Sequence, residues 1–428
     1  MAADLAISPD HVSVRRWLDG GRPRDETIRC IAAALSTKLG RDVSFAEIGF
    51  DSVQGAARAD ITEDGTRYPV ELSQAVDLLD SLTTADLAVS PTVTGSAWTP
   101  ETAPGVITGY LFSAPLGQPY VASAPEAPTA ARIRTTTNHL TELDFQFGGG
   151  HTRSLLLFYW KSEIVPTLRN GHSGVARREI FSAASGAAKV LGWSAYDAGR
   201  HGDAQRYFVQ ALRLAREADD HEMGGQILSN LSHQANYLGK FTEAAQYARA
   251  AQSAIAGSAG GTVRAMFLTM EARALASLGD TKGCVDVLHR ADQEFERRDP
   301  VNDPDWSSYF DALELAGEAA HCFRDLGRSR ETQQFAAQAI EPLLTPPRTR
   351  AFIGMVNAAG ALNGGNLEEA ISLASEAVSL AGSLQSSRYL RYVSDFHQSL
   401  GGSHAGHPLV RRFTDLVKGS YPDIKIGS

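Results

Sequence analysis

Five glycines recur at similar intervals along the chain, and the residues after each of them repeat one pattern of small side chains. They are Gly199, Gly239, Gly279, Gly327 and Gly365, separated by about 40 residues. A period of this length is typical of stacked helical hairpins. The glycine closes the first helix or turns the chain, and small residues let the second helix lie close to its neighbour. We therefore expect an all-α chain built around an α-solenoid, a class that presents a curved surface for binding.

The repeated positions are the fifth, ninth and twelfth after each glycine. In all five copies the residue twelve positions after the glycine is alanine. In chain order, the fifth positions are Ala204, Ala244, Cys284, Thr332 and Ala370, the ninth are Phe208, Ala248, Leu288, Ala336 and Ala374, and the twelfth are Ala211, Ala251, Ala291, Ala339 and Ala377.

Composition limits the classes of protein to which the chain can belong. With 428 residues, 43% of them hydrophobic, it is long enough for two or three domains and for a substantial core. A net charge of −9 argues against a protein that coats nucleic acid over its whole surface, so any DNA contact must come from a local basic patch.

Cysteine spacing and hydropathy indicate the compartment. Cys30, Cys284 and Cys322 are far apart, with no metal-ligand spacing, and we expect reduced, buried thiols. The longest apolar run, residues 155–160, is too short to span a bilayer, and no apolar signal region stands at the N-terminus. We predict a cytoplasmic protein with no membrane contact and no cofactor.

Changes in composition divide the chain into five regions. The Pro-, Ser- and Thr-rich region is expected to be a linker that holds one helix, over residues 70–87, and a short extended piece at 106–112. In chain order we predict a helical domain over 1–53, the linker over 54–128, a degenerate capping hairpin over 129–182, five repeats over 183–382 and C-terminal capping helices over 383–428.

The repeats resemble a known family in their packing positions. Two copies carry the small and large residues of tetratricopeptide repeats, with helices that are longer than usual. Long hairpins of another solenoid type are the alternative. The residues that carry the resemblance are Leu191, Gly192, Gly199, Ala204, Phe208 and Ala211 in the first copy, and Leu231, Gly239, Ala244, Ala248 and Ala251 in the second.

In the tetratricopeptide register, the first helix of each hairpin lines a concave groove. Amides, histidines and arginines over an aromatic patch suit a peptide, a protein segment or a polar small molecule, and a merely solvated face is the alternative. The predicted groove residues are Lys189, Trp193, Tyr196, Gln226, Ser229, His233, Asn236, Arg273, His321 and Arg324, with Thr269, Glu314, Phe352 and Met355 beside them.

Residues 7–20 read as one short capped helix. Ser8 or Asp10 is the N-cap, Gly20 ends the helix, and Val14, Trp17 and Leu18 form one apolar face. A basic turn follows, and then a second amphipathic helix over residues 25–39. This is the layout of a helix-turn-helix DNA reader.

The Trp-x-x-Gly pattern formed by Trp17 and Gly20 resembles the end of the recognition helix in Cro/phage-repressor-type (XRE-like) domains. With the repeats, the whole chain resembles actinobacterial regulators that join such a domain to tetratricopeptide repeats, and residues 16–18, 132–134, 147–151 and 192–212 carry this resemblance. It implies a transcriptional regulator that binds double-stranded DNA, usually as a homodimer, and whose repeats sense a ligand or partner.

Provisional roles follow for the polar residues of this segment. Ser13 and Arg16 would reach base edges in the major groove, and a dimer would read two half-sites about one helical turn apart. The residues expected to contact phosphates are His11, Arg15, Arg22 and Arg24.

One feature departs from the family pattern. Such domains begin with a helix that packs behind the turn, and here only residues 2–6 precede Ile7. We expect that helix to lie upstream, or the domain to be a remnant with weakened DNA affinity. A helical packing module is the corresponding alternative for the segment, and a protein-interaction scaffold that has lost DNA binding is the alternative for the chain.

The usual catalytic patterns are absent from the sequence. It contains no phosphate-binding loop, no HExxH and no strand-flanked GxGxxG. The run Gly148 to His151 lies between two helical patterns and is predicted to be a turn, not an oxyanion hole. We therefore expect no enzymatic activity and no catalytic or metal-binding residues.

Overall fold

The computed structural model divides the chain into two units, Met1–Asp64 and Gly65–Ser428. The described residues are Lys38, 65–88, 97–113, 127–147, 149–172, 174–255, 259–382, 384, 386–401, 404, 406–422 and 424. Apart from Lys38, the predicted helix-turn-helix domain therefore lies outside the described residues, as do all its proposed DNA contacts.

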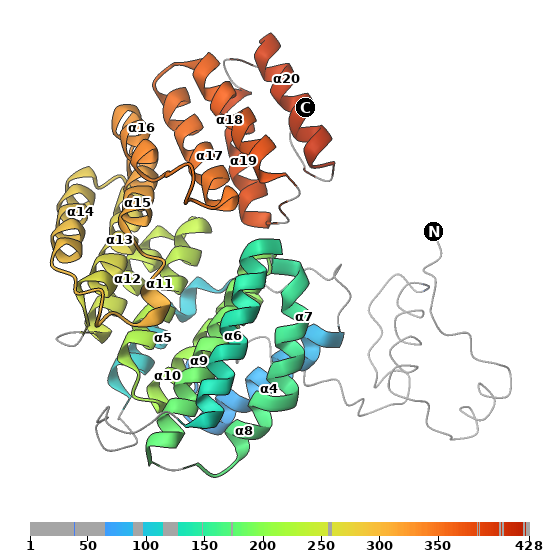
Figure 1. Cartoon of the computed structure of the whole chain (residues 1–428), viewed down its shortest axis with the longest axis vertical. Coiled ribbons are helices and arrows are strands. Elements are labelled where there is room, and N and C mark those ends of the chain that lie inside the picture. Colours follow the sequence, from blue (N-terminus) through green and yellow to red (C-terminus); the bar gives the residue numbers. More distant parts are fainter. Residues whose placement is uncertain are drawn as a thin grey trace, which may run out of the picture. The chain divides into compact units, whose positions relative to one another are not determined.

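Within the second unit the chain forms a series of antiparallel helical hairpins (Figure 1). The described residues contain no strand, and the predicted all-α solenoid is confirmed. None of the helices described is long and apolar enough to cross a membrane. The hairpins pair α9 (Gly174–Asp197) with α10 (His201–Glu217), α11 (His221–Tyr237) with α12 (Phe241–Ala254), α13 (Gly261–Ser277) with α14 (Thr281–Glu296), α15 (Ala312–Asp325) with α16 (Ser329–Gln338), α17 (Pro347–Asn363) with α18 (Leu367–Ala381), and α19 (Ser387–Leu400) with α20 (Pro408–Ser420).

The five repeat glycines end the first helices of their hairpins. Each has a φ between 69° and 81°, the left-handed region that glycine adopts without steric cost. At the first turn, the Gly199 N–H donates to Tyr196 O at 2.9 Å, and the Arg200 N–H donates to Ala195 O at 2.8 Å. The same pair of bonds recurs at the other four glycines. This Schellman arrangement satisfies carbonyls that the helix end would otherwise leave unpaired.

The small residues of the repeat lie where the helices pack most closely. All five residues at the fifth position and all five alanines at the twelfth are at most 2% exposed. In the first hairpin, a Cβ built on Gly192 would lie 2.6 Å from the Phe208 ring, so only glycine allows α9 and α10 this separation. The predicted role of small residues in the array is confirmed at these positions.

The helices before the array include one π turn. Consecutive helices run from α6 (Pro128–Phe147) through α7 (Gly149–Tyr159) and the π turn η2 (Trp160–Ile164) to α8 (Val165–Arg169). In the π turn, the Val165 N–H bonds to Trp160 O, five residues back, and the next residue, Pro166, has no N–H to continue the regular helix. These helices begin the region 129–182, which the sequence predicts to be a degenerate capping hairpin.

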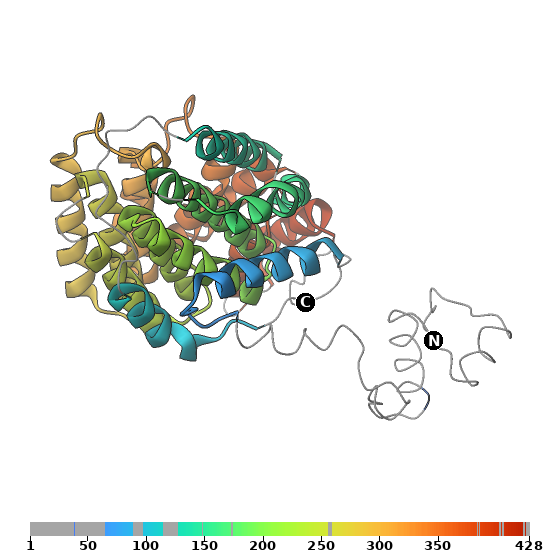
Figure 2. The ribbon, with the colours of Figure 1, turned by 90° about the horizontal axis from the view of Figure 1, so that it is seen from below.

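The region expected to be a linker packs against the array over its described residues. Helix α4 (Leu72–Ala88) contacts α10, and η1 (Pro100–Thr102) leads into α5 (Ala103–Phe112), which contacts α12 (Figure 2). The expected helix over 70–87 is confirmed, but the extended piece expected at 106–112 is wrong. Val106 and Tyr110, four residues apart, are buried on one face of α5, which favours a helix.

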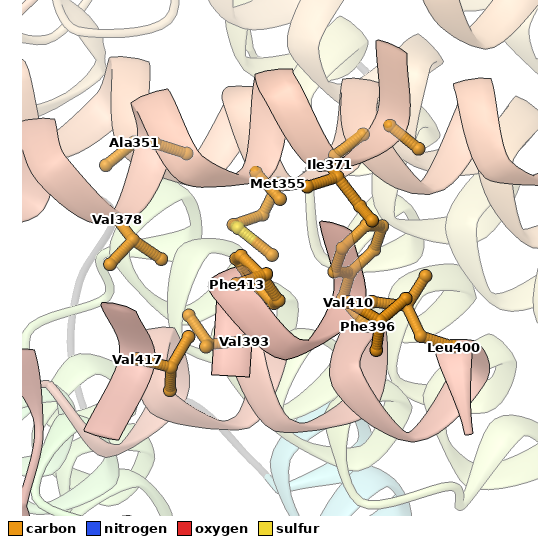
Figure 3. Close-up of a cluster of buried hydrophobic side chains, with 14 of the residues drawn as sticks. Ala351, Met355, Ile371, Val378, Val393, Phe396, Leu400, Val410, Phe413 and Val417 are labelled. Carbon is orange, nitrogen blue, oxygen red and sulfur yellow. The ribbon is translucent and has the colours of Figure 1, made fainter. Parts of the chain in front are cut away.

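An apolar cluster joins the last two hairpins (Figure 3). Met355 of α17 and Ile371 of α18 pack with Phe396 of α19 and with Phe413 and Val417 of α20. The expected C-terminal helices are therefore present, and α19 and α20 form a sixth hairpin that buries its apolar face against the fifth.

Two glycines with open space around the Cβ position provide a test of the turn geometry. Gly239→Ala places a side chain at a φ of 76°, whereas Gly105 lies inside α5. We expect Gly239→Ala to lower the free energy of unfolding by roughly 1–2 kcal/mol. Gly105→Ala is expected to leave it unchanged or to raise it by up to about 1 kcal/mol. Urea denaturation followed by circular dichroism measures both, and equal effects would contradict a conformational role for Gly239.

Candidate ligand-binding face of the array

We use the term inner face for the polar and aromatic side chains that the first helices of the hairpins bring together. These helices are α9, α11, α13, α15, α17 and α19, and each contacts the next in the series. Asp197 near the end of α9 pairs with Arg348 of α17 and Arg388 of α19. The first hairpin therefore meets the fifth and sixth across this face.

An aromatic group lies at the α9–α11 side of the inner face. The rings of Trp193 and Tyr196 stack with centroids 5.2 Å apart, and the His233 ring lies 5.4 Å from Trp193. The Tyr196 hydroxyl and His233 Nδ1 are 3.0 Å apart, within hydrogen-bond distance. With the Asn230 amide oxygen turned toward Trp193, this oxygen accepts from Trp193 Nε1 at 3.0 Å. Helices α9 and α11 thus supply the three rings and the polar groups that they contact.

The Arg388 guanidinium covers this aromatic group. Its central carbon lies 5.1 Å from the Trp193 ring centroid, 5.2 Å from Tyr196 and 5.4 Å from Phe352. Contacts of this kind attract a cation to the negative face of a ring. Arg388 Nε also donates to Asp197 Oδ1 at 2.8 Å. One arginine of α19 therefore joins α9 and α17.

Polar groups of α13 and α15 lie close to Tyr392 of α19. Arg273 donates to Glu318 at 3.1 Å, and this pair is almost fully buried. The Arg324 guanidinium lies 5.3 Å from the Tyr392 ring centroid, and the His321 ring lies 5.8 Å from it. The ring of Tyr392 therefore contacts a histidine and an arginine that come from α15.

Burial changes the protonation of several groups on the inner face. It lowers the pKa of His233 and His321 well below the usual value, and the charge of Arg273 adds to this effect, so both rings are neutral at pH 7. Burial, together with the neighbouring Glu318, raises the pKa of Glu314 to about 8. Burial lowers the pKa of Lys189 to about 8. The arginines therefore carry most of the positive charge of this face.

The structure brings most of the predicted groove residues into contact with one another. Trp193, Tyr196 and His233 form the aromatic group, and Lys189 donates to Gln226 Oε1 at 2.8 Å. Arg273, His321 and Arg324 lie around Tyr392, while Ser229 is buried on α11 and Asn236 is half-buried near its end.

Four residues at which distant helices meet on the inner face were not predicted from the sequence: Asp197, Arg348, Arg388 and Tyr392. The two on α19 were overlooked because this helix was assigned to a cap. Gly401 follows Gly365 by 36 residues, close to the repeat period, and this glycine could have identified α19 as the first helix of a sixth hairpin.

Several polar and aromatic side chains of the inner face are partly exposed. Among the described residues, no group of three or more His, Cys, Asp or Glu residues is placed to hold a metal ion. Trp193, His233, Phe352 and Arg388 each keep part of their surface exposed. Aromatic rings with partly exposed charged and hydrogen-bonding groups can hold a polar ligand by stacking and hydrogen bonds.

Comparison with known protein families gives a match at the N-terminus. Residues 2–51 match the family described as the SP15 N-terminal domain. No curated protein matches the chain. The matched residues coincide with the segment for which the sequence predicts a small helical domain, and they end before the second unit begins.

Proposed function

We propose that this chain is a DNA-binding transcriptional regulator whose helical array senses a ligand or protein partner. The observation that carries the proposal is the sequence of residues 10–24, which combines an apolar stripe with a basic turn. Val14, Trp17 and Leu18 would pack inward, and Arg15 and Arg16 would remain on the outer side. Short helices of this kind place arginines against bases and phosphates.

The inner face supports the sensing part of the proposal. Its rings and guanidinium groups come from helices that are far apart in the chain, and several remain partly exposed. A ligand bound there would contact the first and the last hairpins at once. It would thereby change the curvature of the array, or the geometry of a homodimer and so the spacing of its DNA half-sites.

The test is fluorescence anisotropy of the full chain with the DNA upstream of its own gene, across a salt series. Arg15→Ala with Arg16→Ala is expected to weaken binding at least about tenfold, because each lost contact to a base or phosphate removes a charge-assisted hydrogen bond. Affinity for this DNA should also fall as salt rises.

A second adjacent arginine pair is the matched control. Arg411 and Arg412 are both exposed on α20, and their replacement by alanine is expected to leave DNA affinity unchanged. Equal losses in the two double variants would indicate non-specific attraction. Absence of DNA binding by the wild-type chain would contradict the proposal and favour a protein-interaction scaffold.

A further inference from the structure

Both Nη atoms of Arg388 lack a hydrogen-bond acceptor among the described residues. Arg388 Nε donates to Asp197. The side chain is 17% exposed, so solvent reaches part of it. The three aromatic rings around the guanidinium cannot replace an acceptor oxygen. A guanidinium in this setting retains the fork of N–H groups that binds carboxylate or phosphate.

Contacts on several sides hold this guanidinium in place. The rings of Trp193, Tyr196 and Phe352 lie within 5.4 Å of its central carbon. Asp197 Oδ1 accepts from Arg388 Nε, and it also accepts from Ser386 Oγ at 2.9 Å. A preorganised donor loses little conformational freedom when a ligand binds, which favours affinity.

The charges around Arg388 are of both signs, because Asp197 is negative while Arg348 and Arg273 are positive. Burial acts against ionisation of Asp197, but Arg388 and Arg348 outweigh it and the pKa of Asp197 is lowered, so it is ionised at pH 7. Glu314 also lies within the field of Arg388, and its pKa of about 8 leaves it mostly protonated. The positive charge of Arg273 is also nearby, because Arg273 and Arg388 both lower the pKa of His233 and His321.

From these contacts we propose that the free Nη edge of Arg388 binds an oxyanion, a carboxylate or a phosphate group of the sensed ligand. This proposal deepens the sensing function, because it names the chemistry that the inner face recognises. Asp197 orients the guanidinium through Nε, and its negative charge limits the affinity for the incoming anion. The ligand would thus bind at the point where α9, α17 and α19 meet.

The experiment titrates the full chain with inorganic phosphate and with citrate, using NaCl at the same ionic strength as the reference. Intrinsic fluorescence reports binding because the Arg388 guanidinium lies over the Trp193 ring. The variant Trp193→Phe shows how much of the ligand-induced fluorescence change comes from Trp193. The melting temperature is a second readout. We expect both oxyanions to change the Trp193 signal and to raise the melting temperature more than NaCl does. The oxyanion with the lower dissociation constant, phosphate or citrate, shows whether the site prefers phosphate or carboxylate.

Variants separate this site from general salt effects. Arg388→Gln is expected to weaken oxyanion binding at least about tenfold, since a charge-assisted hydrogen bond is lost. Arg411→Gln, at an exposed arginine of α20, should bind as the wild type does. Asp197→Asn keeps an oxygen that can accept from Arg388 and Ser386 but removes the negative charge, so binding should become severalfold tighter. Loss of folding cannot produce this gain.

Three results would overturn the proposal: oxyanions that act no more strongly than NaCl, unchanged binding by Arg388→Gln, or unchanged or weaker binding by Asp197→Asn. DNA is absent from all of these oxyanion titrations, so they test the oxyanion site independently of DNA binding. A chain that binds oxyanions but not its upstream DNA would therefore contradict the regulator proposal alone, and the reverse result would contradict the oxyanion site alone.

Discussion

Replacing Asp86 by alanine is expected to lower the free energy of unfolding of the helical unit by about 3–5 kcal/mol. Asp86 lies near the end of α4, and its side chain is only 5% exposed. It pairs with Arg153 of α7 and with Arg200, which precedes α10, and it accepts from the Tyr207 hydroxyl at 2.7 Å. Alanine would leave the 9%-exposed Arg153 side chain without this carboxylate, and a buried charge that loses its partner is costly.

Asp77 on the same helix is the matched control. It pairs with Arg169 at 2.9 Å, but the two side chains are 67% and 50% exposed. Exposed pairs contribute little, so Asp77→Ala should cost less than about 1 kcal/mol. Urea denaturation of the full chain, followed by circular dichroism at several protein concentrations, measures both. Similar losses for the two variants would show that Asp86 does not fasten α4 to the array.

The repeat architecture could be predicted because its determinants are local and periodic. Gly239 and its four counterparts occupy one backbone conformation, and Ala251 and its counterparts fill one type of helix contact. Each of these requirements restricts the residue type at a single position. A sequence therefore records them in the same way in every copy, even where the rest of the repeat has diverged.

The packing of the region before the array could not be predicted in this way. Gln210 donates to Gly65 O at 2.9 Å and Gln205 donates to Thr99 O at 2.8 Å, so amide side chains of α10 hold segments more than 100 residues away. Proline, serine and threonine are common both in linkers and in segments held by such contacts. Composition alone does not distinguish the two, because the acceptors are backbone carbonyls that any residue provides.

The inner face was predicted only in part, for a related reason. Trp193 and His233 could be placed on it because each lies on a first helix, at an offset counted from its glycine. The pairing of Asp197 with Arg388 depends on the rotation and translation that accumulate between the first and sixth hairpins. These per-repeat changes are small and come from the packing of whole helices, so no single residue encodes them.

Packing beneath the inner face gives the second large effect. Phe208 of α10 is fully buried, its ring fills the space next to Gly192, and its centroid lies 6.4 Å from that of Trp193. Phe208→Ala is expected to lower the free energy of unfolding by about 3–5 kcal/mol, because it removes a large buried side chain and leaves a cavity. Phe112→Ala is the control, since Phe112 is 80% exposed at the end of α5, and it should cost less than about 0.5 kcal/mol.

A double-mutant cycle with Gly192 shows whether this cost arises at the contact between α9 and α10. In the wild-type background Gly192→Ala should be destabilising, because its Cβ would lie 2.6 Å from the Phe208 ring. In the Phe208→Ala background that ring is absent, and the same substitution should be neutral or should stabilise the protein by up to about 1 kcal/mol through helix propensity. Additive effects would contradict the packing role assigned to Gly192. A change of sign would mean that the spacing of α9 and α10, and with it the position of Trp193 on the inner face, is set by this one glycine–aromatic contact.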